Sequence, residues 1–185
     1  MKILLVVSAL WFFSEIALSR LALLTHAEMD RDRFSLRIIW LTIIISIFLG
    51  IYLSRVQLGR LPIPANYLYM IGICCIVIGL MIRWIAILRL NKSFRVKVTV
   101  TEEQKLVTSG IYKFIRHPSY SGSLLSFLGF AMVFNNWITF IVIFLPILLA
   151  FLYRISVEER VLQEEFEQQY QEYCRKSKRL IPGIY

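Results

Sequence analysis

A polar run at residues 106–120 holds the residue types best suited to chemistry. It reads LVTSGIYKFIRHPSY and combines a glycine, a histidine, a proline and several hydroxyl side chains. Pro118 suits the first turn of a helix, where the N–H that proline lacks is not needed. The free backbone N–H groups of a helix start favour a carboxylate or another anion. A simpler interpretation is a helix cap, in which His117 or Ser119 only satisfies backbone groups.

A second cluster, RISVEER at residues 154–160, follows a long apolar stretch. Arg154 is always charged and can form forked hydrogen bonds to a carboxylate, and the neighbouring acids could bind hydroxyls or a cation. The simpler interpretation is an arginine that extends to the membrane surface beside a solvated helix turn. On a regular helix Arg154 and Glu159 point roughly 140° apart. Both can therefore face one site only if that site is wide or the helix breaks near Ser156.

Composition identifies the surroundings that must position these clusters. Of the 185 residues, 58% are hydrophobic and only 18% are charged, against about 25% charged in an ordinary soluble domain. The mean hydropathy is +0.66. One soluble core of this length could not bury so much apolar surface. Composition therefore excludes an ordinary soluble globular protein, a disordered chain and a disulfide scaffold, and favours a membrane protein.

Five apolar stretches predict an all-α, polytopic membrane protein that forms a single domain over residues 1–185. The longer stretches have the roughly 20 residues that a helix needs to cross the hydrocarbon. Asn135 and Asn136 separate the last two stretches, which are therefore predicted to form a helical hairpin. The predicted spans are about residues 3–24, 36–56, 67–90, 118–134 and 137–153.

Two polar segments are too long to be mere connectors, a loop at residues 91–117 and a tail at residues 154–185. Long loops are where function concentrates. The tail repeats apolar side chains at helical spacing, which predicts an amphipathic helix that packs on the loop or lies along the membrane. These side chains are Leu162, Phe166, Tyr170 and Tyr173.

Basic residues predict the direction of the chain across the membrane. Sixteen lysines and arginines lie with the segments after spans one, three and five, and three lie on the other side, namely Lys2, Arg55 and Arg60. The positive-inside rule then places the C-terminus, the loop and the tail in the cytoplasm and the N-terminus outside. This distribution makes the net charge of +9 a mark of topology, so no nucleic-acid partner is expected.

Three ionisable residues, Glu15, Arg20 and Arg83, lie within the apolar spans. Such residues are functional candidates by default. The two arginines lie near a cytoplasmic end and are predicted to extend to the membrane surface. Glu15 has no such route and is predicted to be paired or protonated. Three cysteines without a C-x-x-C pair and only two histidines predict no metal site.

The two clusters, taken in order, resemble the isoprenylcysteine carboxyl methyltransferase family of integral membrane enzymes. The resemblance lies in LVTSGIYKFIRHPSYSG at residues 106–122, in R-x-x-x-E-E from Arg154 to Glu159, and in F-x-x-x-Y-x-x-Y from Phe166 to Tyr173 followed by Ile181-Pro182. It covers roughly residues 106–182, and spans one to three are similar only in hydropathy. R-H-P-x-Y is shared with phospholipid methyltransferases and, more distantly, with sterol reductases.

This resemblance implies methyl transfer from S-adenosylmethionine to the carboxylate of an isoprenylcysteine-like lipid at the cytoplasmic face. The products would be a methyl ester and S-adenosylhomocysteine. Arg154 and Glu159 are the implied catalytic residues, Arg154 as the clamp on the substrate carboxylate and Glu159 as an acid beside the cofactor. The implied cofactor contacts are Gln104, Lys105, Leu106, Val107, Tyr112, His117, Pro118, Ser119, Tyr120 and Glu159. Gln104-Lys105 departs from the His-Val of animal members.

Elementary chemistry agrees with this transfer. The glycine spacing excludes the Gly-rich turn on which many soluble methyltransferases hold the cofactor. Tyrosines such as Tyr112 and Tyr120 could stabilise a sulfonium by cation–π contact. A carboxylate is nucleophilic at neutral pH, so the enzyme would need to orient the reactants rather than supply a base. The expected partners are the bilayer and a prenylated substrate that enters between spans.

Three other functions remain open on the residues alone. A phosphatidylethanolamine-type N-methyltransferase would need a base or an amine of lowered pKa. A NADPH-dependent membrane reductase would need basic residues for the 2′-phosphate, which the segment at residues 91–116 could supply. A transporter or an assembly partner is less well supported, since many transporters have repeated halves and none is visible.

Overall fold

Five α-helices and one short 3-10 helix make up the part of the chain that the computed structural model describes, residues 2–23, 33–56, 58–95 and 106–185. A helix lies at each of the five predicted spans, and no strand occurs within those ranges, so the all-α class is confirmed. In chain order the elements are α1 (Lys2–Leu23), α2 (Arg33–Ser54), α3 (Ala65–Arg95), η2 (Gly110–Lys113), α4 (Pro118–Met132) and α5 (Trp137–Lys176).

Three of these helices are long and apolar enough to cross a membrane, when the described residues are considered. The candidate spans are Phe34–Ser54 in α2, Ala65–Leu90 in α3, and α5. The apolar stretch of α1, Ile3–Glu15, is shorter, and α4 has 15 residues. A membrane fold is therefore supported, while the count of five crossings and their direction remain predictions.

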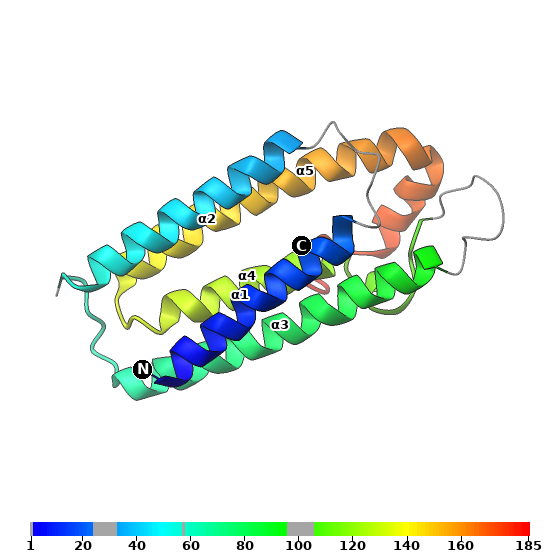
Figure 1. The fold of residues 1–185 in the computed structure, drawn as a ribbon. Helices are drawn as coiled ribbons and strands as arrows, with labels where there is room; N and C mark the ends of the chain where they lie inside the picture. The colour runs from blue at the N-terminus through cyan, green and yellow to red at the C-terminus, as the bar shows by residue number, and fades with distance from the viewer. Residues whose placement is uncertain (1, 24–32, 57, 96–105) are drawn as a thin grey trace.

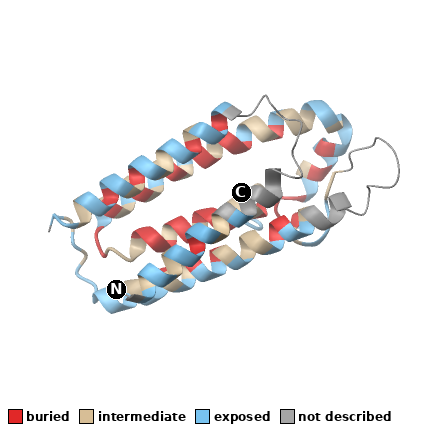
Figure 2. Cartoon of the chain, in the orientation of Figure 1, coloured by how far each residue is buried: buried red, intermediate tan, exposed pale blue. Residues whose placement is uncertain are grey.

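The helices form two associated groups (Figure 1). Helices α3 and α4 pack along each other, with α1 beside α3, and α2 packs along α5. The contact between α4 and α5 joins the groups, and buried residues line both of these helices (Figure 2). At the centre are Ile76, Ile143, Ile147 and Ile155, each less than 2% exposed. Trp11 of α1 adds an edge-on ring contact of 4.8 Å to Phe127 of α4.

Glycines allow α3 and α4 to approach closely. A Cβ atom added to Gly79 of α3 would lie 2.4 Å from the backbone oxygen of Gly122 in α4. Two helical turns away, a Cβ on Gly72 would lie 2.6 Å from the backbone oxygen of Gly129. Close backbone packing of this kind is how small residues hold membrane helices together. It fixes the first turn of α4, where the polar run ends, against α3.

The connection between α4 and α5 is the tight hairpin that the two asparagines predict. Asn135 adopts a positive φ of 49°, and Asn136 caps α5 by accepting hydrogen bonds from the backbone of Ile138 and Thr139. Both side-chain amides also donate to the α2–α3 connection, to Ile63 and Leu58, at 3.1 and 2.8 Å. These bonds tie the hairpin to the rest of the bundle at the end remote from the polar clusters.

Helix α5 continues past the predicted end of span five near Tyr153 and includes most of the tail. Its helical conformation passes through Ser156, and the break lies later, at Glu167, with φ 41° and ψ −113°. Figure 1 shows the chain turning back after this point, in the orange-to-salmon part of the ribbon. The amphipathic tail helix is therefore the continuation of α5. Helix α3 likewise extends to Arg95 and takes up the start of the predicted loop.

The membrane-embedded charges form a cluster of their own. Arg83 of α3 pairs with Glu15 of α1 at 2.7 Å and donates a hydrogen bond of 2.9 Å to the hydroxyl of Ser119 at the start of α4. The predicted pairing of Glu15 is confirmed. The prediction that Arg83 extends alone to the membrane surface is wrong, because a carboxylate and a hydroxyl lie within its reach. The side chain of Arg20 lies outside the described residues.

Removing the charge of Glu15 is expected to lower the free energy of unfolding by about 1–3 kcal/mol, because a largely buried guanidinium loses its charged partner. Thermal unfolding in lipid nanodiscs would compare Glu15→Gln, Arg83→Gln and the double variant. The double variant should lose clearly less unfolding free energy than the two single variants added together, because each of the three variants loses the same ion pair. Strictly additive losses would show that the pair does not stabilise the fold.

Candidate active site

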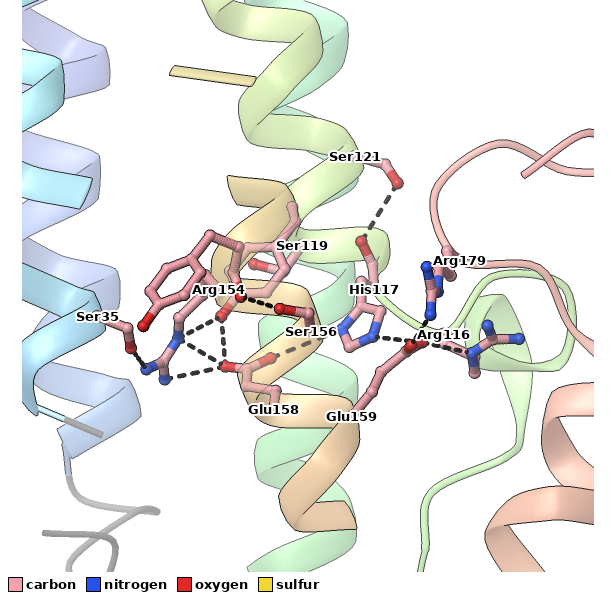
Figure 3. Close-up of polar contacts among 12 residues, drawn as sticks. Ser35, Arg116, His117, Ser119, Ser121, Arg154, Ser156, Glu158, Glu159 and Arg179 are labelled. Atoms are coloured by element: carbon pink, nitrogen blue, oxygen red, sulfur yellow. Dashed lines mark hydrogen bonds and ion pairs between the residues drawn. The ribbon is translucent and has the colours of Figure 1, made fainter. Parts of the chain in front are cut away.

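Arg154 lies where three helices meet at the polar end of α5. It is 8% exposed, and its guanidinium donates to the hydroxyl of Ser35 on α2, to the phenol oxygen of Tyr120 on α4 at 3.3 Å, and to Glu158 one turn further along α5. Figure 3 shows these contacts converging on the one side chain. The surface-arginine interpretation is therefore wrong, because this guanidinium is enclosed and held on several sides.

Glu159 forms a second charged centre on another side of α5. Glu159 is 9% exposed, and its carboxylate accepts from Arg116 at 2.9 Å and from Arg179 at 2.7 Å. His117 Nε2 lies 3.3 Å from the same carboxylate (Figure 3). Two guanidinium groups at this distance strongly favour the ionised carboxylate. Glu159 thus holds together the helix α5, the end of the loop and the segment after α5.

His117 connects the two centres. Its Nε2 faces Glu159, and its Nδ1 lies 3.6 Å from Glu158 Oε2. Its ring also stacks on the Tyr120 ring, with centroids 5.8 Å apart. As the N-cap residue of α4, His117 makes no side-chain capping hydrogen bond. The simple capping interpretation therefore fails for this histidine, whose side chain is part of the charged network.

The two centres are linked without any break at Ser156. Arg154 and Glu159 keep their different directions on a helix that stays regular there, and Glu158 and His117 span the distance between them (Figure 3). Of the two arrangements that the sequence allowed, a helix break near Ser156 is therefore wrong.

The loop before α4 is fastened to α3 and to the tail. The Tyr112 hydroxyl donates to the backbone oxygen of Ala86 at 3.3 Å, and Tyr173 of α5 donates to the backbone oxygen of Tyr112 at 2.6 Å. Burial, followed by the nearby Tyr173 and Glu158, raises the pKa of Tyr112 above its usual range. The phenol of Tyr112 is therefore neutral and acts as a tie to α3.

The segment after α5 completes the site from the other side. Backbone hydrogen bonds join Arg116 to Lys178 at 2.7 Å and Lys178 to Phe114 at 3.0 Å. Arg179, which binds Glu159, also donates to the Tyr185 hydroxyl at 2.9 Å, and that bond raises the pKa of Arg179. The tail does pack on the loop, as its amphipathic pattern predicts.

The structure unites most of the predicted site residues. His117, Tyr120, Arg154 and Glu159 lie in one continuous polar network that Glu158 joins together. Ser119 lies at the start of the same helix and accepts from Arg83 of the neighbouring charged cluster. Pro118 is buried in the first turn of α4, and Leu106 and Val107 are half-buried. Gln104 and Lys105 lie outside the described residues.

Several members of the network were not singled out from the sequence, namely Ser35, Arg116, Glu158 and Arg179. Arg116 and Glu158 stand within the two recognised motifs, so their position was a usable signal. Ser35 and Arg179 carry no local signal, because a lone serine and a tail arginine are common in membrane proteins. Among the described residues, no group of three or more histidine, cysteine or acidic side chains could hold a metal ion.

This architecture matches a known family of transferases. The family model described as phospholipid methyltransferase matches residues 67–169, which is more than half of the chain and includes both motifs. The chain belongs to this family.

The particular relatives are narrower in function than the family description. The chain is 35% identical over 115 residues to protein-S-isoprenylcysteine O-methyltransferase B of Arabidopsis thaliana, a match that covers 61% of this chain and 58% of that protein. It is 33% identical to the protein-S-isoprenylcysteine O-methyltransferase of Schizosaccharomyces pombe, with 62% and 48% covered. The chain thus spans about half to three fifths of the length of these relatives.

A solved structure agrees with these relatives. The eukaryotic intramembrane Ras methyltransferase, isoprenylcysteine carboxyl methyltransferase, superposes with a TM-score of 0.55 at 26% identity, covering 85% of this chain and 54% of that one. The resemblance to isoprenylcysteine carboxyl methyltransferases is therefore confirmed, and all three of these similar proteins are methyltransferases by name. The apolar helices and this neighbour together identify an integral membrane protein.

Proposed function

We propose that the protein transfers the methyl group of S-adenosylmethionine to the carboxylate of an isoprenylcysteine-like lipid, at the cytoplasmic face of a membrane. The observation that carries the proposal is the enclosed guanidinium of Arg154 where the apolar stretch of α5 ends. A lipid with an acidic end would present its carboxylate at this level, while its apolar tail stays in the bilayer. An arginine fork is suited to that group.

The residues around Glu159 fit the cofactor in chemical type. S-adenosylmethionine carries a carboxylate together with an ammonium and a sulfonium cation. The network offers the carboxylates of Glu158 and Glu159, the guanidinium of Arg179 and the ring of Tyr120, groups that bind such charges through ion pairs and cation–π contact. When bound, S-adenosylmethionine supplies an electrophilic methyl group and leaves as S-adenosylhomocysteine. Glu159, His117 and the loop from Leu106 to Tyr112 would hold it.

The task of the protein in this reaction is orientation. A carboxylate already has the lone pair that attacks the methyl carbon, so no side chain needs to remove a proton. Arg154 would bind the carboxylate and direct one oxygen at the methyl group, at a near-attack distance of roughly 3–3.5 Å. Arg154 and Glu159 project from different sides of α5, so lipid acceptor and water-borne donor would approach the network from different directions.

The membrane gives the acceptor its path. Large apolar side chains are exposed along α1, α2 and α3, for example Phe13, Phe48 and Met70, and such a surface is stable against lipid tails. The prenyl chain would reach Arg154 sideways, between helices. The asymmetry of basic residues supports a cytoplasmic location for the network and for the charged part of α5, with the N-terminus outside.

One observation favours a second function, N-methylation of a phosphatidylethanolamine-type headgroup. The matching family model is described as phospholipid methyltransferase, and Glu158 with His117 could accept the proton that an ammonium group must lose. The acceptor distinguishes the two functions, because ester formation needs Arg154 to bind an acid, whereas amine methylation does not.

Calorimetry tests the cofactor half of the proposal. Purified protein in phosphatidylcholine nanodiscs should bind S-adenosylmethionine and S-adenosylhomocysteine with measurable heat and saturable stoichiometry. Nicotinamide dinucleotides, titrated under the same conditions, should give no binding. Binding of a reduced nicotinamide dinucleotide in the absence of any S-adenosylmethionine binding would overturn the proposal in favour of a reductase.

A further inference from the structure

The edge of Arg154 that could hold a substrate carboxylate is already engaged by a carboxylate of the protein. Glu158 Oε1 lies 3.1 Å from Arg154 Nε and 3.0 Å from Nη2. One oxygen thus bridges both N–H groups of the fork. In a bidentate pair each N–H meets its own oxygen, which is the stronger arrangement. The ion pair between Glu158 and Arg154 is therefore weaker than the bidentate pair that a substrate carboxylate could form with the same two N–H groups.

The second oxygen of Glu158 points to another partner. Oε2 lies 3.6 Å from His117 Nδ1, and the Glu158 side chain keeps 23% of its surface exposed, against 9% for Arg154. Figure 3 shows Glu158 between the arginine and the histidine. The Tyr120 hydroxyl also donates to Oε1, at 2.5 Å. A rotation of this carboxylate toward His117 would exchange its bonds to Arg154 and Tyr120 for a closer contact with the histidine, while Arg154 would stay held by Ser35 and by the phenol oxygen of Tyr120.

A second carboxylate cannot enter the fork while Glu158 stays there. Two like charges on one enclosed guanidinium would repel each other strongly, because little water is present to screen them. From this geometry we infer that Glu158 is a specificity-determining residue, an internal carboxylate that holds the fork of Arg154 until an acidic substrate displaces it toward His117. The inference rests on the proposed function of methyl-ester formation.

The same exchange distinguishes substrate from product. In the reaction a carboxylate oxygen forms a bond to the methyl carbon, the carbon–sulfur bond of the donor breaks, and its electron pair remains on sulfur. No proton is transferred. The ester has lost the negative charge of the acid and cannot compete with Glu158 for the guanidinium. Glu158 then returns to Arg154, which favours binding of the acid and release of the ester.

The test compares the binding of an acid and its ester. N-acetyl-S-farnesylcysteine and its methyl ester would be titrated against full-length protein in nanodiscs, in the presence of S-adenosylhomocysteine, for the unaltered protein and for Glu158→Gln. Without the competing charge, the acid should bind about tenfold more tightly or better, as expected for a charge-assisted contact. The affinity for the ester should change little, so the acid-to-ester ratio rises by a similar factor.

Two further variants keep the test decisive. Glu158→Asp retains the charge for folding but is one methylene shorter, so its hold on Arg154 weakens and the ratio should rise less than in Glu158→Gln. Glu165→Gln, an exposed glutamate of the same helix, should leave the ratio unchanged. An unchanged or lowered ratio in both Glu158 variants would overturn the inference. Acid that does not bind the unaltered protein would overturn the proposed function and, with it, this role.

Discussion

Arg154→Ala is expected to lower the rate of methyl transfer by about 10²- to 10³-fold or more while leaving the affinity for S-adenosylmethionine within about twofold. Its guanidinium is enclosed by Ser35, Tyr120 and Glu158, and it is the group that would orient the substrate carboxylate. The affinity for the cofactor should stay unchanged because the proposed cofactor contacts lie around Glu159. Initial rates with radiolabelled donor and calorimetry with S-adenosylhomocysteine measure the two quantities separately.

Two variants control this result. Arg154→Lys keeps the positive charge and loses the planar fork, so it should retain binding of the acid better than alanine does but remain well below normal turnover. Arg160→Ala removes an exposed arginine from the same helix and should have no effect on either quantity. Normal turnover by Arg154→Ala would remove Arg154 from its assigned role.

Glu159→Gln is expected to weaken binding of the cofactor, the property that Arg154→Ala should leave unchanged. Glu159 joins Arg116, His117 and Arg179 through one carboxylate, so its neutralisation leaves two guanidinium groups facing each other without a counter-charge. We expect cofactor affinity to fall by about tenfold or more. The free energy of unfolding should also fall, by about 2–4 kcal/mol, because a largely buried ionic network loses its central anion.

Calorimetry with S-adenosylhomocysteine and thermal unfolding in nanodiscs would measure both effects of Glu159→Gln. Glu164→Gln, an exposed glutamate five residues after Glu159 on the same helix, is the matched control. Unchanged cofactor affinity in a folded Glu159→Gln protein would show that Glu159 is only a structural anchor of the tail. Together with Arg154→Ala, this variant assigns the acceptor and the donor to different ends of the network.

Hydropathy and motif order predicted much of this architecture. The helix positions follow from apolar length, the hairpin from Asn135 and Asn136, and the start of α4 from Pro118. These features depend on neighbouring residues, so they can be recognised in sequence. The recognised motifs also contain Arg154 and Glu159, which the structure joins through Glu158 and His117.

The remaining features depend on contacts between residues far apart in the chain. Ser35 and Arg154 are 119 positions apart, and Glu15 and Arg83 are 68 apart, so no local pattern reveals either pair. The break at Glu167 was equally hidden, because glutamate is a good helix former and no glycine or proline marks the position. His117 and Glu158 both lie within the recognised motifs, but the contacts by which they join Arg154 to Glu159 depend on how α4 packs on α5 and have no local pattern in the sequence.

The most direct test of the proposed activity is the chemical identity of the methylated product. Purified protein in phosphatidylcholine nanodiscs would receive radiolabelled S-adenosylmethionine with N-acetyl-S-farnesylcysteine, with phosphatidylethanolamine, or with N-acetylcysteine, which lacks the lipid tail. We expect label in the farnesylated acid alone, released as volatile methanol by mild alkali because the bond formed is an ester. Label that stays non-volatile in the phosphatidylethanolamine headgroup after alkali, with none in the farnesylated acid, would contradict the proposed activity.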